Sequence, residues 1–151
     1  MNPKPRTHID TVSLADRLRP VLLKLGRELR READAAGISP GQLSLLVAIK
    51  YSPGIGVREL AARERMSGPG MTQALDRLER AGLVTRAPHE SDKRRVGLRL
   101  TDEGQRVLRR VRTRRTAWLA TRLGHLSADE LAAVERAIEP LAQLLDEEKR
   151  A

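Results

Sequence analysis

Apolar residues recur every three or four positions along most of this chain, the spacing that places side chains on one face of an α-helix. Over residues 13–36 this spacing predicts a helix that Ser13 caps and Gly37 ends. Pro20 has no N–H group to donate, so it predicts a kink or a later helix start. The apolar positions of this helix are Leu14, Leu18, Val21, Leu22, Leu25, Leu29 and Ala33.

Two further helix starts carry a capping box, in which a serine and a side chain three residues later each bond the other's backbone N–H group. Ser39 with Gln42 marks the first start, and Ser127 with Glu130 marks the second. The predicted helices span residues 40–50 and 128–148. These starts are the best-defined local signals in the chain.

The middle of the chain predicts two short helices joined by a tight turn. Helical spacing indicates helices over residues 57–65 and 69–81, and the turn between them contains Gly68 and Gly70. This arrangement is typical of a helix-turn-helix, although other small helical hairpins share it. The side chains predicted to face inward are Leu60, Ala61, Met71, Ala74, Leu75 and Leu78.

A β-hairpin is predicted to follow, because apolar residues alternate between Leu83 and Leu100 on both sides of a polar turn. A long helix over residues 102–123, capped by Thr101, comes next. The expected fold is therefore mostly α with a small β-hairpin.

The outward face of the helix over 69–81 carries side chains that can read duplex DNA. Gln can bond adenine, Arg can bond guanine, and Thr can contact a thymine methyl group or a phosphate. Asp76 instead favours an ordinary solvated face, unless it pairs with Arg80 or accepts a hydrogen bond from cytosine. The outward residues are Thr72, Gln73, Asp76, Arg77 and Arg80.

The start of the same helix is nearly bare of side chains. Ser67, Gly68 and Gly70 leave the backbone room to approach a phosphate, whose charge suits the amides and the dipole at a helix N-terminus. We therefore predict that these three residues contact DNA.

The predicted hairpin carries cations at its tip. Arg86, Lys93 and Arg94 are expected to leave the protein body on this loop and enter a minor groove, which attracts positive charge. Asp92 is expected to brace the loop by closing the turn and orienting the Arg94 guanidinium. The alternative is a solvated turn with surplus charge.

Composition supports a polyanionic partner. The 151 residues include 29 Lys and Arg against 20 Asp and Glu, which gives a formal net charge of +9. Tyr51 and Trp118 are the only aromatic residues, so the chain has little with which to stack single-stranded bases. Duplex nucleic acid is the better fit.

Other classes of function find little support. The chain has no cysteine, which excludes disulfides and thiol-based redox or metal chemistry. Its three histidines are scattered, and no hydrolase, zinc-peptidase or phosphate-loop motif occurs, so we expect no enzyme, cofactor or metal site. No apolar run is long enough to cross a bilayer and no signal peptide is evident, so we expect no membrane partner and a cytoplasmic location.

The segment from Asp92 to Gly104 resembles the wing signature of the MarR family of winged helix-turn-helix transcriptional regulators. The matching positions are Asp92, Arg94, Leu98, Leu100, Thr101 and Gly104. Residues 70–84 resemble that family's recognition helix, and residues 38–46 resemble its second helix. The likeness covers nearly the whole chain, although Gly70 stands where many members have serine, which removes one side-chain contact.

The resemblance implies a single MarR-like domain over residues 1–151. Its DNA-binding region would span residues 39–101, and helices over 13–36 and 102–149 would form a homodimer. It also implies that the helix from Pro69 reads a major groove and that Arg94 reaches a minor groove. Members are commonly repressors released by a small molecule, and Tyr51 and Trp118 could line its pocket, although Trp118 suits a core equally well.

The predicted helix over 102–123 is rich in arginine, and the last helix is rich in acids. We favour solvation and pairing between these helices over phosphate contacts by the first arginines. The overall expectation is a dimeric, sequence-specific, duplex-DNA-binding regulator that acts on a pseudo-palindromic operator. The alternative is a winged-helix module that mediates protein or RNA contacts without recognising an operator.

Overall fold

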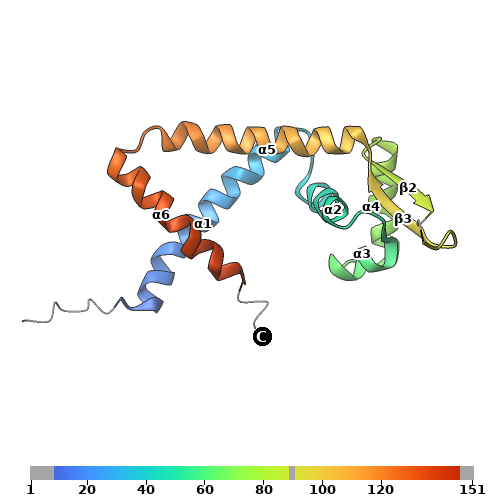
Figure 1. The fold of residues 1–151 in the computed structure, drawn as a ribbon, viewed down its shortest axis with the longest axis horizontal. Coiled ribbons are helices and arrows are strands. Elements are labelled where there is room, and N and C mark those ends of the chain that lie inside the picture. The colour runs from blue at the N-terminus through green and yellow to red at the C-terminus, as the bar shows by residue number, and fades with distance from the viewer. Residues whose placement is uncertain (1–8, 89–90, 147–151) are drawn as a thin grey trace, which may run out of the picture. The chain divides into compact units, whose positions relative to one another are not determined.

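The computed structural model describes residues 9–88 and 91–146, which form helices and one small sheet (Figure 1). The chain divides into two compact units, Met1–Arg115 and Thr116–Ala151. The first unit holds the sheet and most of the helices, whereas the second holds the end of α5 and all of α6. The elements in chain order are α1 (Thr11–Asp34), α2 (Pro40–Tyr51), β1 (Ile55–Gly56), α3 (Val57–Arg63), α4 (Gly68–Arg80), β2 (Val84–Pro88), β3 (Val96–Leu100), α5 (Asp102–Leu123) and α6 (Ala128–Asp146).

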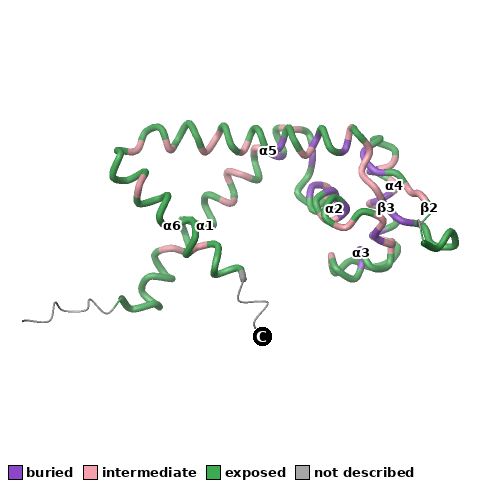
Figure 2. Tube along the Cα trace, in the orientation of Figure 1, coloured by how far each residue is buried: buried purple, intermediate pink, exposed green. Residues whose placement is uncertain are grey.

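The hydrophobic core lies among α2, α3, α4 and the sheet, where Figure 2 shows most of the buried positions. Inward positions predicted for α3 and α4 are confirmed, because Leu60, Met71, Leu75 and Leu78 are each 0% exposed. Ala74 is half-buried against the same core. The largest fully buried side chains are Leu46, Ile49, Leu60, Met71, Leu75, Leu78 and Leu98.

Both predicted capping boxes are present. The Gln42 N–H donates to Ser39 Oγ at 3.2 Å, and the Ser39 N–H donates to Gln42 Oε1 at 3.1 Å. In the second box the Ser127 N–H and hydroxyl both donate to the Glu130 carboxylate, at 2.8 and 2.9 Å. These bonds, the backbone one first, lower the pKa of Glu130, because they favour its charged form.

The predicted cap of the first helix is wrong, and of the two outcomes predicted for Pro20 the later start is wrong, whereas the kink remains a prediction. α1 begins at Thr11, not after Ser13, because the Asp10 carboxylate accepts hydrogen bonds from the Val12 and Ser13 N–H groups. The helix also starts before Pro20 and continues through it. Residues around this proline are exposed, so solvent can satisfy the carbonyl group that it leaves without a donor.

The sheet has three antiparallel strands in the order β1-β3-β2, one more than the predicted hairpin. β1 consists of only Ile55 and Gly56, which is too short for alternation to reveal it. It pairs with β3 through Gly56 opposite Gly97, and the Gly54 N–H donates to the Leu98 carbonyl at 2.8 Å. The extra strand ties the wing, which is the hairpin of β2 and β3, to the segment that follows α2.

Other boundaries agree closely with the sequence. α5 begins at Asp102 as expected, with the Gly104 N–H donating to Thr101 Oγ1 at 3.0 Å. α6 begins at Ala128, and residues 147–148 of its predicted end lie outside the described residues. Over residues 9–88 and 91–146, no helix is both long and apolar enough to cross a membrane.

We predict that Gly97→Ala destabilises the protein by about 1–3 kcal/mol. An added Cβ would lie 2.7 Å from the Gly54 carbonyl oxygen and 2.9 Å from its Cα, both backbone atoms that cannot rotate away. Gly41→Ala in α2 is the control, because a Cβ there meets nothing within 4 Å. Urea unfolding should show the loss for Gly97→Ala alone, and equal stability of both variants would contradict the close approach.

Candidate nucleic-acid interface

The turn between α3 and α4 positions the start of α4. Ser67 caps α4 through its hydroxyl, which accepts a hydrogen bond from the Gly70 N–H at 3.2 Å. Ser67 and Gly68 are exposed, Gly70 is half-buried, and a Cβ on Gly68 would meet nothing within 4 Å. The helix start is therefore exposed and carries little side-chain bulk, and the Ser67 side chain already has a structural role.

The polar face of α4 is fixed by the burial of its opposite face. Met71, Leu75 and Leu78 anchor the helix in the core. This burial leaves Thr72, Gln73, Arg77 and Arg80 exposed to solvent. The exposed side chains combine donors, acceptors and positive charge, which is the chemistry that major-groove base edges require.

Asp76 and Arg86 are paired with each other, which corrects two predictions. Arg86 lies in strand β2 and is half-buried, not on the hairpin loop. Its Nη2 lies 2.9 Å from Asp76 Oδ1, and its Nε lies 3.2 Å from Glu79 Oε2 without hydrogen-bond geometry. Arg80, the partner first considered for Asp76, instead donates to the Asp76 backbone carbonyl at 3.3 Å.

This ion cluster of Asp76, Glu79 and Arg86 joins α4 to the wing. The single positive charge of Arg86 offsets part of the negative charge of the two carboxylates on α4, which would otherwise repel a phosphate backbone more strongly. The cluster also fixes the side chain of Arg86, so reaching DNA would require breaking both ion pairs. The geometry assigns Arg86 a structural contact, and its predicted contact with DNA remains untested.

The tip of the hairpin is cationic, as predicted. Asp92 closes the turn, since its Oδ1 accepts from the Arg94 N–H at 3.0 Å and its carbonyl accepts from the Arg95 N–H at 2.9 Å. Asp92 therefore braces the Arg94 backbone; within the described part of the chain its carboxylate makes no contact with the Arg94 guanidinium. Lys93, Arg94 and Arg95 are all exposed.

Two exposed cations near these elements are absent from the set predicted from sequence. Arg95 follows Arg94 at the hairpin tip, and its place in the same run of cations as Lys93 and Arg94 is a signal from which it could have been predicted. Arg65 lies in the turn between α3 and α4 and adopts a positive φ of 53°. No periodic pattern signals this second residue, because a turn has no repeating face.

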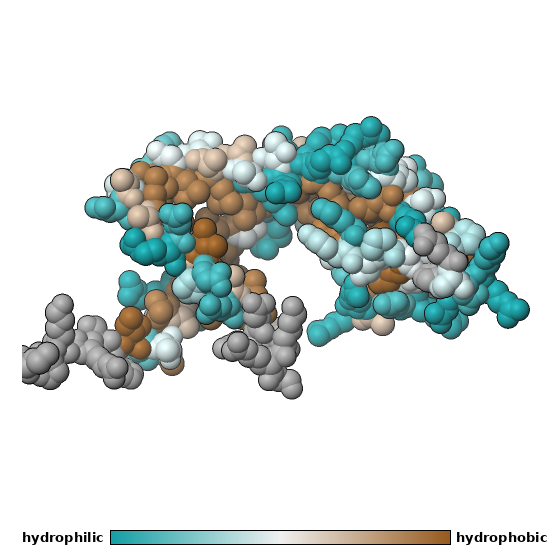
Figure 3. Space-filling model, viewed as in Figure 1, coloured by the Kyte–Doolittle hydropathy of each residue, from teal (hydrophilic) through white to brown (hydrophobic). Residues whose placement is uncertain are grey.

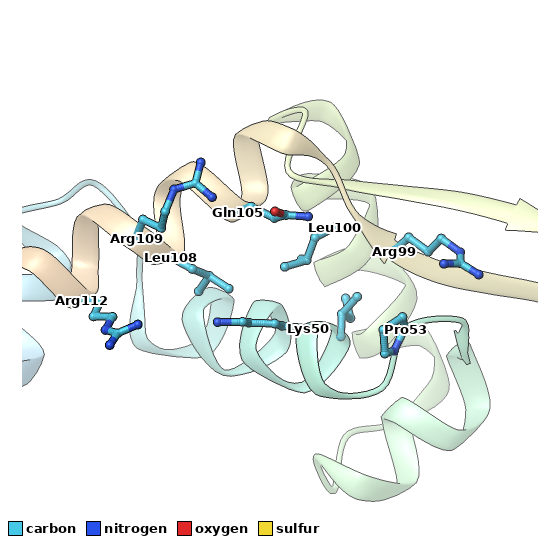
Figure 4. A pocket seen from close by; sticks show the side chains of 9 residues that line it. Lys50, Pro53, Arg99, Leu100, Gln105, Leu108, Arg109 and Arg112 are labelled. Atoms are coloured by element: carbon cyan, nitrogen blue, oxygen red, sulfur yellow. The ribbon is translucent and has the colours of Figure 1, made fainter.

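A pocket of about 390 Å³ lies between the end of α2, the end of β3 and the first turns of α5 (Figure 4). Its lining combines apolar and cationic side chains and contains no acid. In Figure 4 the guanidinium of Arg109 points away from α2, whereas Leu100 and Leu108 point toward it. The lining residues are Ile49, Lys50, Pro53, Arg99, Leu100, Gln105, Leu108, Arg109 and Arg112.

The two residues predicted to line an effector pocket do not line this one. Tyr51 is 75% exposed, with Lys50 Nζ 5.5 Å from its ring centroid. Trp118 is half-buried, and the guanidinium of Arg122 stacks 3.7 Å from its ring centroid. Among the lining residues, Lys50 is adjacent in sequence to one of the two predicted residues, Tyr51.

Several arginines of α5 have partners within the first compact unit. Glu103 pairs with Arg106 at 2.8 Å, and Glu32 of α1 pairs with Arg114 at 3.2 Å. Arg115 donates from Nε to the Leu29 carbonyl at 2.9 Å. The pairing predicted between α5 and the acids of α6 remains untested.

Metal chemistry finds no site in what the structure describes. Across residues 9–88 and 91–146, no three His, Asp or Glu side chains lie close enough together to hold an ion.

We predict that the Arg86–Asp76 pair contributes a coupling energy of about 0.5–1 kcal/mol to stability. A double-mutant cycle with Arg86→Met and Asp76→Asn measures this coupling by urea unfolding. The matched control is the Arg19–Asp16 pair of α1, whose side chains are 65% and 63% exposed and should couple more weakly. Equal coupling in the two cycles would show that the cluster does not tie α4 to β2.

Comparison with known proteins places this interface in a family. The MarR family model matches residues 38–96. An uncharacterised HTH-type transcriptional regulator of Mycobacterium bovis, Mb0904, is 33% identical over 89% of this chain and 94% of its own. The HTH-type transcriptional repressor MdtR of Bacillus subtilis is 29% identical over 88% of this chain and 86% of its own.

A solved structure agrees with these relatives. A putative transcriptional regulator from Pseudomonas aeruginosa superimposes with a TM-score of 0.74 and 34% identity, over 89% of this chain and 94% of the other. The helix-turn-helix with its polar reading face, the cationic hairpin and these likenesses agree. The chain belongs to the MarR family of DNA-binding, winged helix-turn-helix transcriptional regulators, which are not enzymes.

Proposed function

We propose that this protein binds a pseudo-palindromic operator as a homodimer, represses transcription there, and is released from the DNA by a small molecule. The observation that carries the proposal is the exposed set of Thr72, Gln73 and Arg77 on a helix whose other face is locked in the core. A cationic hairpin follows the same helix in the chain, so one subunit can contact bases and backbone together. Such a regulator would act in the cytoplasm, where the operator lies.

Exposed apolar residues support the homodimer. In the first unit, α1 and Ile9 just before it leave many apolar side chains in solvent. In the second unit, α6 does the same (Figure 3). A second copy of the chain could cover both sets, which supports a dimerisation region in residues 13–36 and 102–149. The exposed residues are Ile9, Val12, Leu14, Val21, Leu22, Leu23, Leu25, Leu131, Val134, Ile138, Leu144 and Leu145.

Repression is the simplest outcome of such binding, because a dimer that occupies promoter DNA blocks access to it. The relative MdtR is a transcriptional repressor by name, which supports the same role here. The rival is a winged-helix module that binds protein or RNA. A module that binds protein or RNA would not explain why Gln73 and Arg77 are exposed beside the uncrowded start of α4.

We predict different effects from the two DNA-facing elements. Gln73→Ala and Arg77→Ala should each weaken operator binding by about 1–3 kcal/mol and relax discrimination at particular base pairs. Arg94→Ala should weaken binding to all duplexes alike and make its dependence on salt concentration shallower by about two units of slope, one for each subunit of the dimer. The affected base pairs should form two half-sites about 10 base pairs apart.

The measurement is a titration of each variant against the selected operator and its single-base variants at two salt concentrations. Arg136→Ala removes one exposed cation of α6 and serves as the control for net charge. If Gln73→Ala and Arg77→Ala keep full selectivity while Arg94→Ala binds normally, the rival function is correct.

The cationic pocket supports the response to a small molecule, and its lining favours an organic anion. Ile49, Leu100 and Leu108 offer an apolar surface, and Lys50 and Arg112 supply positive charge. A carboxylate attached to an apolar body would satisfy both parts of the lining. The pocket touches both β3, which carries the hairpin, and α5, so its occupant could influence the DNA-binding elements.

We predict that benzoate lowers operator affinity, whereas benzamide at equal concentration does not, because only the first carries a charge. Lys50→Met and Arg112→Met should each weaken the benzoate effect about tenfold or more, since hydrogen bonds to charged groups contribute about 1.5–3 kcal/mol. Operator titration with either compound checks this. Equal effects of the acid and the amide would exclude charge recognition in the pocket.

A further inference from the structure

Three helices of the first unit end in the same backbone motif. After each helix one residue takes a positive φ, and the following N–H returns to a carbonyl five residues earlier, the pattern of a Schellman cap. The returning bonds join Ile38 to Ala33, Met66 to Ala61, and Leu83 to Leu78, at 3.5, 2.9 and 2.9 Å. The three ends are therefore alike in hydrogen bonding.

The residue at positive φ differs among these ends. Gly37 after α1 has φ 82°, and Gly82 after α4 has φ 72°. The corresponding residue after α3 is Arg65, with φ 53°, the only non-glycine at positive φ in the part of the chain that the structure describes. Glycine adopts this conformation without strain, whereas a Cβ there collides with the backbone.

Local packing does not explain the arginine. Its side chain is exposed, and among residues 9–88 and 91–146 it makes no hydrogen bond or ion pair. The hydrogen bonds of the cap are made by backbone N–H groups of Arg65 and Met66, so glycine would keep them. The side chain therefore sits at a strained backbone position without a hydrogen bond or an ion pair to any residue that the structure describes.

The position itself points to a ligand. Arg65 lies two residues before Ser67, the cap of α4, and the next residue, Gly68, has no side chain to obstruct the approach of a phosphate. A cation in this turn would lie near the same DNA phosphates that the start of α4 approaches. The strained turn therefore coincides with the edge of the DNA-facing surface.

We propose that Arg65 is a DNA phosphate contact, retained at the helix-turn-helix turn at the expense of fold stability. The inference rests on the proposed operator binding. It adds a residue that positions the recognition helix on the backbone and reads no base. Its signature is weaker DNA binding without loss of stability, because removing the side chain relieves strain while it removes a phosphate contact.

The experiment compares Arg65→Gly, Arg65→Asn and Arg65→Lys with the unaltered protein. Asparagine tolerates positive φ without the extra flexibility of glycine, and lysine keeps the charge with a comparable strain. Thermal unfolding is measured for each, and affinity for the selected operator and for a scrambled duplex is measured at three salt concentrations.

We expect Arg65→Gly and Arg65→Asn to unfold at the same temperature as the unaltered protein or up to about 3 °C higher. Their affinity should fall about 5- to 25-fold, because each subunit of the dimer loses one exposed ion pair with the DNA. The loss should be the same on operator and scrambled duplex. The salt slope should become shallower by about one for each phosphate that the variant no longer neutralises. Arg65→Lys should restore most of the affinity and the slope.

Unchanged affinity in Arg65→Gly would overturn the inference, and so would a lower unfolding temperature, which would show that the side chain stabilises the fold. A loss confined to the operator would overturn it as well, because that result indicates base reading. Failure of the unaltered protein to prefer the operator over the scrambled duplex would instead refute the proposed function.

Discussion

The burial of one face of α4 determines how the DNA-facing surface is arranged. Met71, Leu75 and Leu78 have no solvent exposure, and they share the core with Leu60 of α3 and Leu98 of β3. A helix fixed through three successive inward positions cannot rotate about its axis without exposing one of them. Because this rotation is prevented, Gln73 and Arg77 point to solvent in a defined direction, which recognition of base edges requires.

Charge is distributed around this fixed helix in two distinct ways. The two acids of α4 share Arg86, which offsets part of the negative charge that they would otherwise present to a phosphate backbone. At the hairpin tip the Asp92 carboxylate bonds the Arg94 backbone, which leaves the guanidinium available to a ligand. The same residue types, Asp and Arg, therefore hold the elements together in one place and expose cations in another.

Local signals in the sequence were sufficient for most of the fold, and contacts between distant residues were not. Capping by Ser39 and Ser127 depends on neighbours three residues away, so sequence alone predicted it. The pairing of Asp76 with Arg86 spans ten residues and two elements, so side-chain direction could be known only from the packed structure. Strand β1 and the positive φ of Arg65 were not predicted for a related reason. A strand of two residues and a single turn residue are both too short to show a periodic pattern.

The hydrogen bonds around Thr101 suggest how the pocket and the DNA-binding elements are joined. Thr101 lies between β3 and α5, and its hydroxyl donates to the carbonyl of Gly82, the residue that ends α4. Leu100, its neighbour, lines the cationic pocket. A ligand that displaced Leu100 would therefore disturb a bond that connects the end of α4 to the start of α5. Because α4 is fixed in the core, such a disturbance would not easily rotate α4 about its axis. It would more readily change the angle between α4 and the hairpin of β2 and β3.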